Sequence, residues 1–306
     1  MASPRRFSPL PRQIQGRARF ALVAATALAL LLVPQGLVWA QAQEKGKQLC
    51  INQINKNFAK LAKVQSKEIM GCIGRRSKGL LDGTIEQCMT ADSKGKVAKA
   101  IEKILAKEEA KCSDPLPDFA YTTGSTAADA AIDKEISLIH SIFGSDLDAS
   151  LVLAFFNKNA SRCQADVLKT AQGCQSAKLK AFNLCKKEAI KGRKVDAVTS
   201  AEELQDACLS LDASGGTPDP KGTIAKACEA KLGAKIKGKC ENKDVDMGMV
   251  FPGFDPNDNL REWVESRVDC QTCRAIVIAD DLNQNCDLFD DGVANASCST
   301  TASPTD

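Results

Sequence analysis

The spacing of the cysteines constrains this chain more than any other feature, because the same spacing occurs twice. Cys50 and Cys72 are 22 residues apart, and so are Cys163 and Cys185. Both intervals are rich in lysine and alanine and carry apolar residues at helical spacing. Each then passes through a loop to another cysteine, a second helical stretch and a closing cysteine. The shared order and spacing predict an internal duplication of a helical unit.

The duplication restricts how the cysteines pair. A continuous helix places Cys50 and Cys72 about 33 Å apart, whereas bonded cysteines have Cα atoms within about 7 Å of each other. These two cysteines therefore do not bond to each other. If the two helices of each copy pack antiparallel, the helix ends meet. That geometry predicts the bridges Cys50–Cys112, Cys72–Cys88, Cys163–Cys240 and Cys185–Cys208.

The second copy carries two extra cysteines. Cys174 lies 11 residues after the first cysteine of this copy, and Cys228 lies 12 residues before the last. Antiparallel helices bring these two positions to almost the same height, because both helices rise equally per residue. The first copy has Leu61 and Ile101 at the equivalent positions. A fifth bridge, Cys174–Cys228, is therefore predicted in place of an apolar contact.

The first 40 residues have the pattern of a secretory signal peptide. Five arginines and no acidic residue precede an apolar run over residues 20–33, and Pro34 with Gly36 then breaks the helix. Cleavage is expected after Ala40, or alternatively after Ala42. An uncleaved membrane anchor is the competing interpretation, which the break at Pro34 disfavours. In an exported chain, 14 cysteines favour disulfides over thiols and a periplasmic or extracellular location.

Cleavage changes the charge of the protein. The whole chain has 41 basic and 38 acidic side chains, and loss of the five signal-peptide arginines leaves a net charge of −2. The basic isoelectric point belongs to the precursor, so no nucleic-acid binding is expected. Apart from the signal, no apolar stretch is long enough for a stable membrane span, and none is expected after cleavage.

Charge alternates in sign along the rest of the chain. Residues 41–112 carry a net charge of +7, residues 113–160 of −5, residues 161–240 of +6 and residues 241–306 of −10. In one interpretation, the acidic segments dock on the basic hairpins within the chain. In the other, a lysine-rich helical face binds an anionic partner such as a cell-envelope polymer.

The remaining segments also show helical patterns. A helix is predicted over Ala127–Phe143, with Thr126 as its N-cap, and another over Leu260–Leu282. An aromatic content of 5% favours small stapled modules over one large core. The expected segments are a signal peptide (1–40), a first helical Cys repeat (41–118), an acidic helical connector (119–160), a second helical Cys repeat (161–242), a C-terminal Cys module (243–298) and a disordered tail (299–306).

The C-terminal module holds the motifs that come nearest to metal chemistry. The four cysteines Cys270, Cys273, Cys286 and Cys298 match a zinc site in number, although disulfides are the default in an exported protein. Their spacing leaves the pairing among them open. Residues 287–292 faintly resemble a calcium loop but lack the EF-hand spacing and its terminal glutamate, so a solvated acidic turn is preferred.

No catalytic constellation stands out. His140 is the only histidine and lies on an apolar helical stripe, which favours a packing role. The chain has no G-x-S-x-G, phosphate-loop or dinucleotide-binding glycine pattern, and no pair of carboxylates is singled out as acid and base. No catalytic residue, metal ligand or cofactor is therefore predicted.

The strings from Cys50 to Cys112, from Cys163 to Cys240 and from Cys270 to Gly292 resemble a group of exported bacterial proteins rich in Cys, Lys and Ala. The resemblance covers most of the mature chain and implies an envelope or secreted setting, but no activity, cofactor or site. The prediction is an all-α protein of duplicated disulfide-stapled helical hairpins plus a small C-terminal Cys-rich helical module. We expect an exported, non-catalytic binding or structural protein; the alternative is an unrecognised secreted enzyme or a zinc- or calcium-binding module.

Overall fold

The computed structural model describes residues 43–193, 197–209, 217–293 and 295–298. Within these ranges the chain forms helices and connecting turns without any strand, which confirms the all-α prediction. The predicted signal peptide and the predicted disordered tail lie outside the described residues. The elements in chain order are α1 (Lys45–Ser77), α2 (Ile85–Thr90), α3 (Lys96–Lys111), α4 (Gly124–Phe143), α5 (Leu147–Ser150), α6 (Lys158–Ala189), α7 (Ala201–Cys208), α8 (Thr223–Ala225), a π-helical segment (Lys226–Leu232), α9 (Gly233–Lys239), a 3₁₀ turn (Glu241–Lys243), α10 (Met247–Val250), α11 (Leu260–Asp280) and α12 (Cys286–Asp291).

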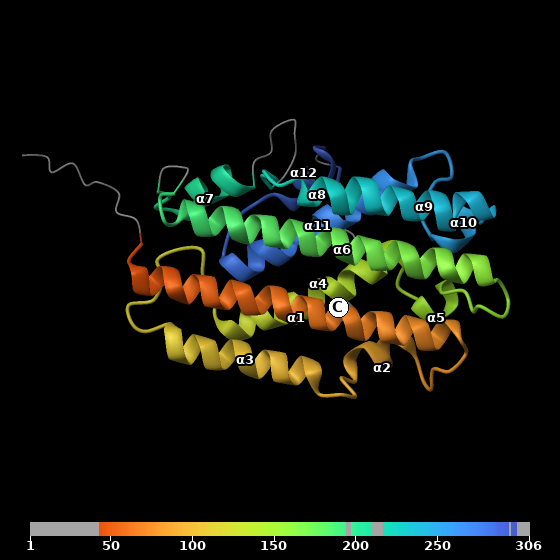
Figure 1. Ribbon diagram of the computed structural model, residues 1–306, viewed down its shortest axis with the longest axis horizontal. Helices are drawn as coiled ribbons and strands as arrows, with labels where there is room; N and C mark the ends of the chain where they lie inside the picture. The colour runs from red at the N-terminus through yellow and green to blue at the C-terminus, as the bar shows by residue number, and fades with distance from the viewer. Residues whose placement is uncertain (1–42, 194–196, 210–216, 294, 299–306) are drawn as a thin grey trace, which may run out of the picture. The chain divides into compact units, whose positions relative to one another are not determined.

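Each copy of the duplication is a helical hairpin. Helix α1 packs along α3, and α6 packs along the π-helical segment and α9. The long helices of the two copies, α1 and α6, also contact each other and run side by side in opposite directions (Figure 1). The antiparallel hairpins inferred from cysteine spacing are therefore the arrangement observed.

A matching segment, residues 92–100 in the first copy and residues 219–227 in the second, caps the second helix of each hairpin. Asp92 accepts hydrogen bonds from the backbone N–H groups of Val97 and Ala98, and Asp219 does the same for the first turn of α8. Gly95 and Gly222 take left-handed conformations, with φ of 59° and 60°. Glycine adopts this conformation without a Cβ penalty, so the carboxylate can reach the unpaired N–H groups of the helix start.

The π-helical segment, Lys226–Leu232, resolves a length difference between the copies. The chain from Asp92 to Cys112 spans 20 residues, whereas the chain from Asp219 to Cys240 spans 21. A π-helical turn closes on the fifth residue instead of the fourth and so takes up one extra residue with little added rise. The second helix of this hairpin can therefore bring Cys240 to Cys163, as the second helix of the first hairpin brings Cys112 to Cys50.

Both repeats contribute to the same core. The described residues form two buried apolar clusters, and each draws on α1, α4, α6 and α11. Phe143 and Phe251 stack in the first cluster, with ring centroids 5.7 Å apart, while Phe58 and Phe182 lie in the second. The segment boundaries expected from the sequence stay predictions. Helices from both repeats, from the connector and from the C-terminal module nevertheless share these two clusters. Alanines at 127, 128, 130 and 131 of α4 are buried, and such small side chains allow the helices to approach closely.

Helix α4 begins three residues earlier than predicted. Its N-cap is Thr123, whose hydroxyl accepts from the N–H of Thr126, so the cap predicted at Thr126 was wrong. The reason lies in α3: Glu108 accepts from the N–H of Gly124 at 2.8 Å and from the hydroxyl of Tyr121 at 2.7 Å. A carboxylate placed at the helix start satisfies an unpaired donor and the positive end of the helix dipole.

Candidate functional site

The structure pairs all the cysteines, and no free one occurs among the residues it describes. The bridges proposed from antiparallel geometry are the ones present: Cys50–Cys112, Cys72–Cys88, Cys163–Cys240, Cys185–Cys208 and Cys174–Cys228. Their Cα–Cα distances of 4.7–5.9 Å are ordinary for disulfides. The structure also supplies the pairing that the spacing left open, Cys270–Cys298 and Cys273–Cys286.

The C-terminal cysteines are not arranged as a zinc site. Cys270, Cys298 and Asp290 offer ligand atoms within 4.8 Å of one another, but the two sulfur atoms are bonded to each other. Zinc binds thiolates, and a disulfide offers none. The second bridge, Cys273–Cys286, removes the other two cysteines as ligands in the same way.

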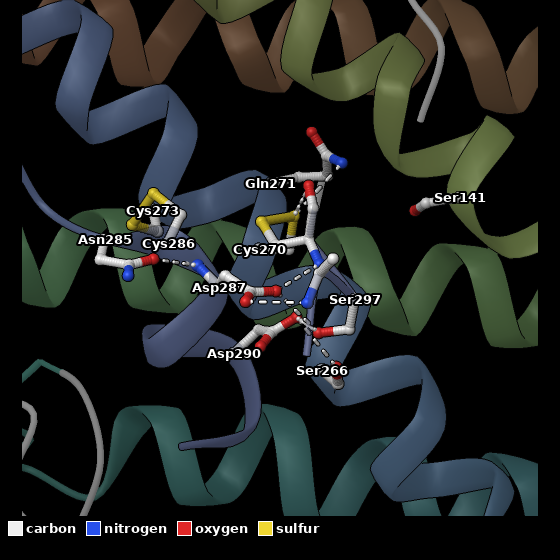
Figure 2. The surroundings of a disulfide bond; sticks show 12 residues. Ser141, Ser266, Cys270, Gln271, Cys273, Asn285, Cys286, Asp287, Asp290 and Ser297 are labelled. Carbon is white, nitrogen blue, oxygen red and sulfur yellow. Dashed lines mark hydrogen bonds between the residues drawn. A yellow bond between two sulfur atoms is a disulfide. The ribbon is translucent and has the colours of Figure 1, made fainter. Parts of the chain in front are cut away.

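The segment that resembled a calcium loop is a helix, α12, and not a solvated turn. Asp287 accepts from the backbone N–H groups of Ala296 and Cys298, at 2.9 and 3.1 Å, and these bonds lower its pKa. Asp290 accepts from the hydroxyl of Ser297 at 2.8 Å. Figure 2 shows both carboxylates directed at the segment that carries Ser297. Asp290 is only 8% exposed, and burial, despite the opposing bond from Ser297, raises its pKa to about 6.

A polar cavity of about 330 Å³ lies beside this module, lined among others by His140, Arg267 and Asp290. Its charged groups serve the fold. His140 Nδ1 donates to the carbonyl oxygen of Gly144 at 3.2 Å, at the end of α4. Arg267 donates to two backbone carbonyls and stacks over Trp263, 3.4 Å from the ring centroid. The bond from Arg267 to the carbonyl oxygen of Ser141 ties α11 to α4, whereas the bond from His140 closes the C-terminal end of its own helix.

A second and larger hollow, of about 620 Å³, lies between α1 and α6, and we call it the lysine groove. Its lining residues are Leu49, Asn52, Gln53, Asn55, Lys56, Ala59, Lys60, Lys63, Lys180, Asn183, Leu184, Lys187 and Lys191. Within each helix the groove lysines recur at spacings of three, four or seven residues, so they share a face of that helix. Lys191 lies just after the end of α6. Six of the lining residues are lysines and none is acidic, so the groove has a strongly positive wall.

The lysines of this groove are electrostatically uncompensated. Within the described residues, none of the six takes part in an ion pair. Loss of solvation, together with the nearby charges of Lys56 and Lys103, lowers the pKa of Lys60. A bound anion would relieve this repulsion and stabilise the protonated amines.

Asn55 adds a hydrogen-bond donor to the lysine groove. The residue is 5% exposed, and its Nδ2 atom has no hydrogen-bond partner in the described part of the chain. Leaving a buried amide donor unpaired costs on the order of 1–3 kcal/mol. By contrast, the neighbouring Asn52 donates to the carbonyl oxygen of Gln48 at 2.7 Å. The Nδ2 atom is buried beneath the groove surface, so an anion in the groove would meet it only after the Asn55 side chain rotates.

Other basic residues do meet acidic segments inside the chain. Lys178 of α6 pairs with Asp269 of α11 at 2.5 Å, and Lys186 pairs with Asp280. Arg76 lies 3.6 Å from Asp148 of α5. Contacts with acidic segments of the same chain therefore compensate one set of basic side chains. The lysines of the groove are a different set, which these contacts leave unpaired.

Buried Glu135 of α4 gives a pH-dependent prediction. The residue is 3% exposed, its Oε2 atom lacks a hydrogen-bond partner among the described residues, and burial raises its pKa well above the usual value. The folded protein therefore binds this proton more tightly than the unfolded chain, whose glutamate titrates near about 4.3, and stability falls as pH rises above that value. We expect Glu135→Gln to raise the free energy of unfolding at neutral pH and to flatten this decline, as urea unfolding from about pH 4 to about pH 8 would show. A decline as steep as in the unsubstituted protein would contradict the assignment.

Comparison with protein-family models, curated proteins and solved structures found no match for this chain. Among the helices of the described residues, none combines the length and the apolar character needed to cross a membrane. The seven disulfides fit an oxidising environment.

Proposed function

We propose that the protein is exported to the periplasm or cell exterior and binds an anionic envelope polymer in the lysine groove, without catalysing a reaction on it. The observation that carries the proposal is the uncompensated positive wall, six lysines with no acidic residue, held between two long disulfide-stapled helices. The predicted signal peptide and the disulfides support the compartment.

The dimensions of the groove favour a polymer over a small anion. Its α1 wall runs from Leu49 to Lys63, a length of about 20 Å at about 1.5 Å per residue. Charges spread over that distance are best matched by a chain of repeated anionic groups. The exposed edges of Leu49 and Leu184, 44% and 38% exposed, add apolar surface for the backbone of such a polymer.

The kind of cation that lines the groove predicts how it would select among anions. Lysine is a compact point charge, and the lining contains no arginine whose planar fork would match a carboxylate or phosphate in two bonds. Binding should therefore depend on charge density and weaken with salt, and depend little on the chemical nature of the anion.

Charge reversal on both walls tests the proposal. For Lys56→Glu combined with Lys187→Glu, we expect at least about a tenfold loss of affinity, since each lysine near an anionic surface contributes on the order of 1 kcal/mol. Fluorescence anisotropy with labelled polygalacturonate and with linear polyphosphate would measure it at low and at physiological salt. Both probes should bind the unsubstituted protein, more weakly at higher salt.

A matched control separates the groove from net charge. Lys99 and Lys231 are exposed lysines outside the groove lining, and replacing both with glutamate changes the net charge by the same amount. This variant should lose much less affinity. Equal losses in the two variants, or no binding of either polymer at low salt, would overturn the proposal.

A further inference from the structure

In the disulfide Cys72–Cys88, a guanidinium group contacts the sulfur atoms. The Nη2 atom of Arg75, an exposed residue of α1, donates to Cys88 Sγ at 2.6 Å and lies 3.7 Å from Cys72 Sγ. Cys72 is 1% exposed, whereas Cys88 of α2 is half-buried. Cys88 is therefore the cysteine of this bridge nearer to solvent, and both sulfur atoms lie next to a guanidinium.

The duplication provides an equivalent bridge whose sulfur atoms have no arginine contact among the described residues. Cys185–Cys208 is the second-copy equivalent, with a Cα–Cα distance of 5.7 Å against 5.9 Å, and Cys185 is also half-buried. Arg75 lies three residues after Cys72, and the residue three after Cys185 is Glu188. One turn of helix past the cysteine, the first copy therefore has a cation and the second a carboxylate.

We infer that Cys72–Cys88 is a thiol–disulfide exchange site that an external dithiol reduces, while Cys185–Cys208 is a structural bridge. A thiolate of the dithiol attacks Cys88 Sγ, the disulfide bond breaks, and its electron pair leaves with Cys72 Sγ as a thiolate. The second thiol of the reagent, once deprotonated, then attacks the mixed disulfide and releases Cys88 as a thiolate. The dithiol has lost two electrons and two protons and become a disulfide, and the protein has gained two electrons as two thiolates, which protonate according to pH.

The charge beside the sulfurs sets the rate of this sequence. Arg75 attracts the incoming thiolate and stabilises both leaving thiolates, since a cation favours the anionic sulfur. Among the described residues, no cationic side chain donates to the sulfur atoms of the second bridge, whose printed contact is from Cys185 Sγ to the carbonyl oxygen of Ala207. Glu188 stands at the equivalent helix position, and a carboxylate there would disfavour an incoming thiolate.

The fold around Cys88 would survive opening of the bridge. Gln65 of α1 donates to the carbonyl oxygen of Met89 at 3.0 Å, and Asp148 accepts from the N–H of Ile85 at 3.2 Å. Ile85 and Met89 are also buried in the core. Helix α2 therefore remains attached to α1 and α5 after reduction, so the change is local and reversible.

Partial reduction of the folded, full-length protein tests the inference. The oxidised chain is treated with limiting dithiothreitol, free thiols are alkylated at successive times, and peptides are mapped by mass spectrometry. We expect Cys72 and Cys88 to be alkylated first, about tenfold faster than Cys185 and Cys208. Opening of Cys185–Cys208 as fast as Cys72–Cys88 would overturn the inference.

Two variants assign the effect to charge. Arg75→Gln should slow opening of Cys72–Cys88 by about tenfold, and Glu188→Arg should speed opening of Cys185–Cys208. Arg76→Gln is the control, because Arg76 is the next residue but bonds to Asp148. An unchanged rate in Arg75→Gln, or an equal slowing in Arg76→Gln, would contradict the role given to Arg75. Circular dichroism of each variant shows that the comparison is made on folded protein.

Discussion

Replacing Asp280 with leucine, or Lys186 with methionine, is expected to lower the free energy of unfolding by about 3–5 kcal/mol, whereas replacing both together should leave stability near its original value or raise it. The two residues pair between α6 and the end of α11, with side chains 1% and 3% exposed. Removal of one partner leaves a buried charge without compensation. Removal of both eliminates the cost of desolvating the pair.

The surroundings of the pair show why it contributes little net stability. Burial raises the pKa of Asp280 and lowers the pKa of Lys186, in each case against the attraction of the partner. Asp280 also sits in the last turn of α11, where the helix dipole disfavours an anion. The first copy has buried Ile73 at the position equivalent to Lys186, so an apolar residue suits this place in the hairpin.

A double-mutant cycle measured by urea unfolding checks this prediction. The two single variants and the double variant give a coupling energy between the side chains, which should be close to the sum of the two single losses. Additive losses, with the double variant least stable, would show that packing and not charge accounts for the effect.

Removal of the Cys174–Cys228 bridge is the second change with a large expected effect. Its cysteines are 54 residues apart, and closing such a loop contributes roughly 4 kcal/mol on the entropy model. The Cys163–Cys240 bridge already joins the same two helices, which shortens the effective loop to the 11- and 12-residue arms between the bridges. We therefore expect a loss of roughly 3 kcal/mol for the double replacement by alanine.

The first copy supplies the matched comparison. Leu61 and Ile101 occupy the equivalent positions there, counted from Cys50 and from Asp92, and Leu61 is fully buried. Replacement of Cys174 by leucine together with Cys228 by isoleucine should therefore lose less stability than the alanine pair, because apolar burial offsets part of the lost constraint. Chemical denaturation under non-reducing conditions measures both variants. Equal losses would mean that the π-helical segment around Cys228 does not accept the first copy's apolar contact.

Much of the hairpin architecture could be predicted because the signals are local or repeated. Helical periodicity identified α1 and α6, and the rise per residue excluded a bond between cysteines 22 residues apart. The repeat then related each cysteine to a partner, as the structure pairs them. The C-terminal pairs had no second copy and no length constraint, so their pairing stayed open until the structure supplied it.

The candidate groove could be predicted only in part. Lysine-rich blocks indicated a positive face, but one-dimensional charge counts do not separate lysines that meet an acid from those that do not. Lys178 and Lys180 are two residues apart on α6, yet Lys178 pairs with Asp269 while Lys180 lines the groove. Their helical directions differ by about 200°, at about 100° per residue, so the docking of α11 decides which of them is covered.

The sequence by itself determined the helical class, the duplication and the bridges within each hairpin, since periodicity and helix rise act along a single chain segment. Tertiary structure decided how the two copies share their core, which lysines stay uncompensated, and which disulfide meets an arginine. These depend on contacts between helices far apart in sequence. The buried Lys186–Asp280 pair is of this kind: 94 residues separate its partners, and nothing in either local pattern indicates that they meet.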